Sequence, residues 1–159
     1  MKIGIIRYPG SNCDMDTKRY FPNSFFIWHN LYTINNLENI DLIVIPGGFA
    51  FGDRIYEKAT EDYEIQPGKK AIESPVTTII LDAVSKNIPI LGICNGFQIL
   101  IELGLLPGHL VINNTKKFVC KQVSVICDSE KYDMYIANKY GNYVPDNYTK
   151  IFLEYETKQ

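Results

Sequence analysis

The stretch 88–100 reads Ile-Pro-Ile-Leu-Gly-Ile-Cys-Asn-Gly-Phe-Gln-Ile-Leu, and it places a cysteine between an apolar run and an amphipathic segment. The run 88–93 is typical of a buried strand, and Phe97 and Leu100 follow at the spacing of a helix face. A strand, a sharp turn and a helix, with a nucleophilic side chain on the turn, form a nucleophile elbow. The stretch therefore predicts that Cys94 is a reactive thiol where a strand ends and a helix begins.

The helix that follows Cys94 gives this thiol its predicted chemistry. A helix N-terminus favours a thiolate, so we expect the pKa of Cys94 to be lowered. It also leaves N–H groups near the sulfur that can hold an oxyanion. Gly92 lets neighbouring backbone approach, and Gly96 keeps the first turn of the helix slim. The polar Asn95 and Gln98 favour a reactive site. The alternative is an inert cysteine buried at the end of a core strand.

Composition excludes several classes of protein. A chain of 159 residues with a net charge of −2 is long enough for one domain, and it has no basic excess for binding nucleic acid or anionic membranes. No apolar run approaches the roughly 20 residues of a membrane helix, and the first residues resemble a strand rather than a signal peptide. The cysteines are widely spaced, without a metal-binding pattern, so we expect no metal and reduced thiols in the cytoplasm: Cys13, Cys94, Cys120 and Cys127.

Apolar runs alternate with helical patterns along the first two thirds of the chain. We expect strands over 2–7, 24–28, 41–45 and 88–93, and helices over 14–20, 74–85 and from Asn95 to about Gly104. This order predicts an α/β fold: a doubly wound, mostly parallel sheet with helices on both faces. The later part of the chain suggests short antiparallel strands over 118–120 and 123–126, then a tyrosine-rich region and a frayed end over 154–159.

Three loops leave the carboxyl edge of the predicted sheet, and all contain glycine and small polar residues. They cover residues 9–14, 46–53 and 92–96, and the second opens a long polar loop that reaches about residue 73. Ligands of such sheets bind beyond the carboxyl ends of the strands. We therefore expect the three loops to form one site.

These loops also carry a family resemblance. Tyr-Pro-Gly-Ser-Asn-Cys-Asp at 8–14, Pro-Gly-Gly-Phe-Ala-Phe-Gly-Asp at 46–53 and Gly-Ile-Cys-Asn-Gly-Phe-Gln-Ile-Leu at 92–100 together resemble the glutamine amidotransferase subunits (PurQ) of phosphoribosylformylglycinamidine synthase. The resemblance covers 2–120 and is unclear over 128–159. It implies a single flavodoxin-like domain over 1–159, of the class I glutamine amidotransferase type and shortened at its C-terminus.

The resemblance also implies an activity and a set of site residues. The family hydrolyses L-glutamine to glutamate and ammonia through a cysteine thioester. A synthetase subunit, which works with a small accessory subunit, uses that ammonia and ATP to amidinate formylglycinamide ribonucleotide in purine synthesis. Carried over by motif, Cys94 is the nucleophile, the N–H groups of Asn95 and of Gly47 or Gly48 hold the oxyanion, and Gln98 shapes the glutamine pocket. The resemblance implies no cofactor on this chain and places ATP and magnesium on the synthetase.

A cysteine amidase also needs a base, which the family supplies as His-x-Glu near its C-terminus. This sequence has no His-x-Glu after Cys94, and neither of its two histidines fits the role. His29 follows the second predicted strand, and His109 follows a turn after the elbow helix. We therefore expect that the chain stops short of the family's last segments, with the nucleophile present and the base absent.

Three functional hypotheses follow. The first is the glutaminase part of the synthase, either truncated or completed by a second chain. The second is a degenerate subunit that binds the synthetase or glutamine without turnover. The third is another cysteine-elbow hydrolase or a chaperone-like protein, in which the thiol pairs with an upstream carboxylate such as Asp14, Asp53 or Glu57.

Overall fold

The centre of the molecule is a four-stranded parallel sheet. The computed structural model describes residues 1–34, 37–50 and 73–156. Its parallel strands lie in the order β2-β1-β3-β4: β1 (Ile3–Arg7), β2 (Phe25–Trp28), β3 (Leu42–Ile45) and β4 (Ile90–Gly92). This is the strand order of a flavodoxin-like fold, so the predicted fold class is confirmed.

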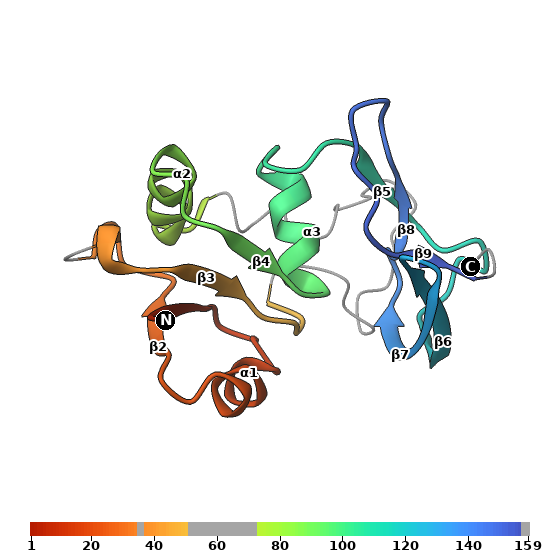
Figure 1. The fold of residues 1–159 in the computed structure, drawn as a ribbon, viewed down its shortest axis with the longest axis horizontal. Helices are drawn as coiled ribbons and strands as arrows, with labels where there is room; N and C mark the ends of the chain where they lie inside the picture. The colour runs from red at the N-terminus through yellow and green to blue at the C-terminus, as the bar shows by residue number, and fades with distance from the viewer. Residues whose placement is uncertain (35–36, 51–72, 157–159) are drawn as a thin grey trace.

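Helices cover both faces of this sheet, as the sequence predicts. Helix α1 (Asp14–Tyr20) lies against one face, and α2 (Val76–Ser85) and α3 (Asn95–Glu102) lie against the other (Figure 1). Both faces of the sheet carry apolar side chains that must be covered. On β1, Ile3 and Ile5 pack on the α1 side, whereas Ile6 packs into the larger core under α2 and α3. A single 3-10 turn, η1 (Leu37–Asn39), precedes β3.

The elbow helix approaches the sheet more closely than a side chain would permit. A methyl group at Gly96 would lie 2.0 Å from the carbonyl oxygen of Ile45. Because no real Cβ atom comes so near to a backbone oxygen, only glycine lets the first turn of α3 pack on the end of β3. The slim first helical turn expected from Gly96 is confirmed.

The last third of the chain forms two small antiparallel sheets. Strand β5 (His109–Val111) pairs with β8 (Asn142–Val144), and β6 (Val119–Cys127) lies between β7 (Glu130–Asn138) and β9 (Glu154–Tyr155). The expectation of two short strands over 118–120 and 123–126 was wrong, because they belong to one nine-residue strand, β6.

The hairpin that joins β6 to β7 explains why the sequence pattern is weak there. Its turn consists of Asp128 and Ser129, whose φ angles of 48° and 70° are those of a type I′ turn. Asn-Gly is the sequence that usually marks this turn, and this chain lacks it here. The side chains of β7 are mostly exposed, so the alternation of Tyr132, Met134 and Ile136 along this strand does not mark a buried face.

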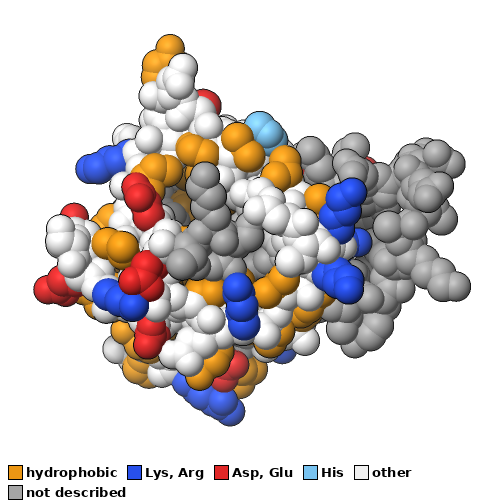
Figure 2. Space-filling view, turned by 90° about the vertical axis from the view of Figure 1, so that its right-hand side faces the viewer, with side chains coloured by type: hydrophobic (Ala, Val, Ile, Leu, Met, Phe, Trp, Pro, Cys, Tyr) orange, Lys and Arg blue, Asp and Glu red, His pale blue; other side chains and the backbone are white. Residues whose placement is uncertain are grey.

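The antiparallel strands stand beyond the carboxyl ends of the parallel strands (Figure 1). The Phe97 ring of α3 meets Tyr143 edge-on at 5.2 Å, and Phe49 lies 6.0 Å from Phe118. Figure 2 looks onto this end of the molecule, where acidic, basic and hydrophobic side chains are interspersed. Within the described ranges, none of the helices has the length and apolarity to cross a bilayer.

Candidate functional site

The three loops expected at the carboxyl edge meet in the structure. The N–H of Cys13 donates to the carbonyl of Gly47 at 3.1 Å, and the N–H of Phe49 donates to the carbonyl of Gly10 at 3.1 Å. A methyl group at Gly47 would lie 3.4 Å from Cβ of Cys94. The loops after β1, β3 and β4 therefore share one site, at which Gly47 lies in the middle.

Cys94 is the exposed and strained residue of this site. It caps α3 with φ 52° and ψ −109°, a backbone conformation that residues with a side chain seldom adopt. Its thiol is exposed, which excludes the alternative of an inert cysteine buried in the core. The carbonyl of Cys94 accepts the N–H of Gln98 at 3.1 Å, so the helix begins directly at the turn. This is the geometry of a nucleophile elbow.

The two backbone segments that the sequence predicts as oxyanion donors both adjoin Cys94: the start of α3 and the glycine loop after β3. Asn95 begins α3, and the first N–H groups of a helix have no partner within it. A methyl group at Gly48 would lie 2.6 Å from the backbone nitrogen of Asn12, so only glycine fits there. The backbone of Gly47 and Gly48 can thus lie close to Cys94. Their role as oxyanion donors, together with Asn95, remains a prediction.

The side chains of Asn95 and Gln98 are buried and bound to each other. Nδ2 of Asn95 donates to Oε1 of Gln98 at 2.9 Å, and Nε2 of Gln98 donates to the carbonyl of Tyr140 at 3.0 Å. Gln98 therefore joins the elbow helix to the segment between β7 and β8. Its predicted effect on a glutamine pocket would be exerted through the position of that segment.

Neither histidine is assigned as the base of Cys94. His29 follows β2, which is three strand spacings from β4, or about 14 Å. Its carbonyl accepts the N–H of Val76 at 3.0 Å, so its backbone anchors the start of α2. His109 is exposed at the start of β5, after α3 has run about 12 Å from Cys94.

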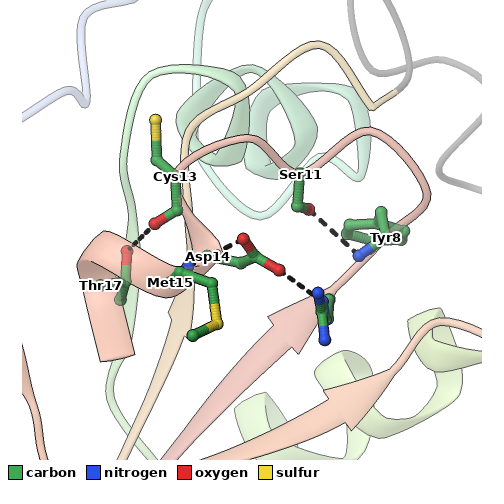
Figure 3. A network of polar contacts seen from close by, with 7 residues as sticks. Tyr8, Ser11, Cys13, Asp14, Met15 and Thr17 are labelled. Atoms are coloured by element: carbon green, nitrogen blue, oxygen red, sulfur yellow. Dashed lines mark hydrogen bonds and ion pairs between the residues drawn. The ribbon is translucent and has the colours of Figure 1, made fainter. Parts of the chain in front are cut away.

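Of the three carboxylates considered, Asp14 is already engaged. It is buried, forms an ion pair with Nε of Arg7, and accepts the N–H of Met15 at 2.8 Å (Figure 3). The Arg7 guanidinium also lies 4.8 Å from the Trp28 ring centre and 4.9 Å from that of Phe26, so two aromatic rings help to position the arginine. Because Asp14 already has these partners, it is a poor candidate for the carboxylate that the third hypothesis pairs with the Cys94 thiol. Asp53 and Glu57 lie outside the described residues.

Two residues near Cys94 were not predicted from the sequence to belong to the site. Sγ of Cys13 lies 3.6 Å from the position of a methyl group at Gly47, and Figure 3 shows this thiol pointing away from the polar network of Asp14. Burial raises the pKa of Cys13, and the charges of Asp16 and Asp14 raise it further. The motif at 8–14 could have directed attention to this thiol.

The second missed residue is Tyr155 on β9. Burial raises its pKa, and the charge of the Cys94 thiolate raises that pKa further, so the phenol lies within electrostatic range of the thiol. No sequence signal points to it, because β9 has only two residues and lies far from Cys94 along the chain.

Comparison with known proteins identifies the family. The model of the CobB/CobQ-like glutamine amidotransferase domain matches residues 1–147. The PurQ subunit of phosphoribosylformylglycinamidine synthase from Chlorobaculum parvum is 37% identical over 161 residues, covering 90% of this chain and 58% of the relative. The PurQ subunit from Aquifex aeolicus is 39% identical over 137 residues, covering 82% and 54%. This chain therefore spans just over half the length of these curated relatives.

A solved structure agrees with these relatives. The structure of PurLQS from Thermotoga maritima contains a chain that matches with a TM-score of 0.82 and 31% identity. The match covers 98% of this chain and 74% of that one. Sequence and fold lead to the same group of proteins, and this chain belongs to the CobB/CobQ-like glutamine amidotransferase family, alongside its PurQ members.

Proposed function

We propose that this chain is the glutaminase component of a phosphoribosylformylglycinamidine synthase, with Cys94 as the nucleophile. The observation that carries the proposal is the exposed thiol on a strained turn, against the glycine loop after β3. The PurQ identity of the similar chains supports the choice of substrate. Within this proposal, L-glutamine binds with its side-chain amide over Cys94.

The reaction uses two covalent steps. The Cys94 thiolate attacks the amide carbon, and the negative charge on the oxygen is held by the N–H groups of Asn95 and of Gly47 or Gly48. The carbon–nitrogen bond breaks as the nitrogen gains a proton, which releases ammonia and leaves a γ-glutamyl thioester. Water then hydrolyses the thioester to glutamate and restores the thiol.

The proton transfers are the weak part of this site. The sequence contains no His-x-Glu, and we assign neither histidine to Cys94. General acid–base help is worth about 10²–10⁴ in rate, so the isolated chain should turn over slowly. A second polypeptide that places a histidine beside Cys94 would restore this factor.

The same proposal names the partners. Ammonia would pass to a synthetase subunit, which would hold ATP and magnesium, with a small accessory subunit in the complex. The PurLQS assembly of the similar solved chain supports a complex of this kind. We place the complex in the cytoplasm, where the reducing environment keeps the Cys94 thiol available.

Glutamate release from glutamine tests the proposal, measured with and without the synthetase subunit. The expected result is slow release by the wild-type chain, faster release in the complex, and none above background in Cys94→Ala. Cys127→Ser is the matched control and should behave as wild type. Release that survives Cys94→Ala would contradict the assignment of the nucleophile.

A second candidate function is glutamine binding without turnover. It is favoured by the lack of an assigned base. Calorimetric titration with glutamine separates the two, because heat of binding with no glutamate release in the complex would support the binding module. Binding together with release that depends on Cys94 would support the glutaminase.

A further inference from the structure

We infer that Cys13 and Cys94 form a reversible disulfide, which makes the elbow a redox-sensitive site. A methyl group placed on Gly47 would lie 3.6 Å from Sγ of Cys13 and 3.4 Å from Cβ of Cys94. The two atoms are therefore no more than about 7 Å apart. Both cysteines stand as exposed thiols in the structure.

Gly47 leaves the space between the two cysteines open. A methyl group at this position would contact both the sulfur of Cys13 and Cβ of Cys94. Glycine removes that obstacle, so the loop after β3 carries no group that would separate the thiols. A disulfide needs Cβ atoms about 3.5–4.5 Å apart, so closing the bond requires the two loops to bring the Cβ atoms of Cys13 and Cys94 to this separation. Rotation of the two exposed side chains about their Cα–Cβ bonds then turns the sulfurs toward each other.

The backbone holds both cysteines to the same short segment. The N–H of Cys13 donates to the carbonyl of Gly47 at 3.1 Å. The residue before Cys94 is held in the same way, because the N–H of Ile93 donates to the carbonyl of Ile45 at 3.0 Å. The two loops are therefore positioned relative to each other by the end of β3, which limits the conformational freedom that closing the bond would cost.

The other two cysteines cannot form a pair with each other. Cys120 and Cys127 lie seven residues apart on strand β6, which separates their Cα atoms by about 23 Å. That distance far exceeds the span of a disulfide. Cys120 and Cys127 serve instead as internal references for thiol reactivity.

The oxidant that we name is a hydroperoxide. The Cys94 thiolate attacks the peroxide oxygen, the O–O bond breaks, and Cys94 becomes a sulfenic acid as water leaves after proton transfer. The Cys13 thiolate then attacks the Cys94 sulfur, forming the S–S bond and releasing a second water. Two thiols lose two electrons and hydrogen peroxide gains them. Burial and two carboxylates raise the pKa of Cys13, so less of this thiol is ionised. Cys94 is therefore the thiol that reacts with the oxidant first.

The consequence for activity rests on the proposed function. A Cys94 sulfur bound to Cys13 cannot attack glutamine, so oxidation would stop ammonia production and a dithiol would restore it. The bond would also protect Cys94 from oxidation to the sulfinic acid, which thiols do not reverse.

Peptide mass mapping tests the inference without any assay of turnover. The full chain is treated with hydrogen peroxide, blocked with an alkylating agent and digested with trypsin, which yields peptides 8–18 and 87–116. We expect these two peptides to be joined, two of the four thiols to be lost, and both to return with dithiothreitol. Cys127→Ser, the control, should give the same cross-link.

Cys13→Ser provides the second measurement. In this variant the cross-link is absent, and Cys94 should gain two oxygens that dithiothreitol does not remove. Reversible oxidation confined to Cys120 or Cys127 would overturn the inference. So would a wild-type chain in which Cys94 becomes a sulfinic acid at the same peroxide dose that produces this acid in Cys13→Ser. A cross-link without any glutaminase activity would confirm the disulfide and count against the proposed function alone.

Discussion

At the scale of single residues, the site depends on a cysteine whose backbone is strained. Cys94 has φ 52° and ψ −109°, and such conformations cost about 1–3 kcal/mol when a side chain is present. The cost is offset by the packing of α3 on β3, which Gly96 makes possible. The reactive position of Cys94 and the close contact at Gly96 are therefore two parts of one local structure.

Replacing Gly96 by alanine tests this local structure. The added methyl group would lie 2.0 Å from the Ile45 carbonyl oxygen, so α3 must move away from the sheet. We expect the free energy of unfolding in urea to fall by about 3 kcal/mol. Gly104→Ala is the matched control, because its methyl group meets no atom and only the left-handed conformation at φ 67° opposes it, at about 1 kcal/mol. Equal losses in the two variants would contradict this explanation.

The buried Tyr8 predicts how stability depends on pH. Burial raises the pKa of its phenol above the ordinary value of 10.0, so the folded state holds this proton more tightly than the unfolded state. The free energy of unfolding should therefore fall as the pH rises above about 10, by up to about 1.4 kcal/mol per pH unit for this group. Tyr8→Phe should show a smaller slope in denaturant titrations, and an unchanged slope would show that Tyr8 is not the group responsible.

Single residues also show which parts of the site the sequence could predict. Cys94, Gly92 and Gly96 belong to one continuous motif, so their spacing alone indicates the elbow. Cys13 and Tyr155 approach Cys94 only because strand order and hairpin geometry bring distant segments together. Local sequence patterns carry no information about such proximity.

At the scale of elements, α1 is anchored by a charge pair in a mostly buried position. The Asp14 side chain is 7% exposed and that of Arg7 is 32% exposed, and the pair ties the start of α1 to the end of β1. Because Cys13 directly precedes α1, the same pair fixes the loop that carries the second thiol.

Asp14→Asn should destabilise the protein by about 2 kcal/mol, since it leaves the Arg7 guanidinium without its carboxylate in a poorly solvated place. Asp16→Asn removes the pair with Arg19, in which both side chains are at least 70% exposed, and should change stability by no more than about 0.5 kcal/mol. Chemical denaturation measures both variants. An Asp16→Asn loss as large as that of Asp14→Asn would contradict the distinction between buried and exposed pairs.

Elements differ in how well the sequence predicts them. Strands β1 and β3 are apolar because both of their faces are covered, and their runs stand out against the polar loops. The buried strand predicted over 88–93 is only partly so, because Leu91 of β4 is 42% exposed. Strand β7 is as long as any strand in the described structure, yet its side chains are mostly exposed. It forms because β6 supplies its hydrogen bonds and a tight turn fixes its register, and neither cause depends on a buried apolar face.

At the scale of the whole molecule, the C-terminal strands are connected to the nucleophile through the elbow helix. Gln98 binds the carbonyl of Tyr140, and Phe97 packs on Tyr143. A partner that binds the antiparallel sheets could therefore influence the turn at Cys94 without contacting it. This connection was outside the reach of sequence analysis, which matched no family motif beyond residue 127.

The central claim is that Cys94 is an activated nucleophile at an elbow, and its alkylation rate tests that claim most directly. The full chain is exposed to iodoacetamide at several pH values, and modification of Cys94 and of the exposed Cys120 is followed by mass spectrometry. We predict that at about pH 6 Cys94 reacts at least about tenfold faster than Cys120, because a lowered pKa leaves more thiolate. Excess glutamine should slow Cys94 alone. Equal rates with the same pH dependence at both cysteines would contradict the account.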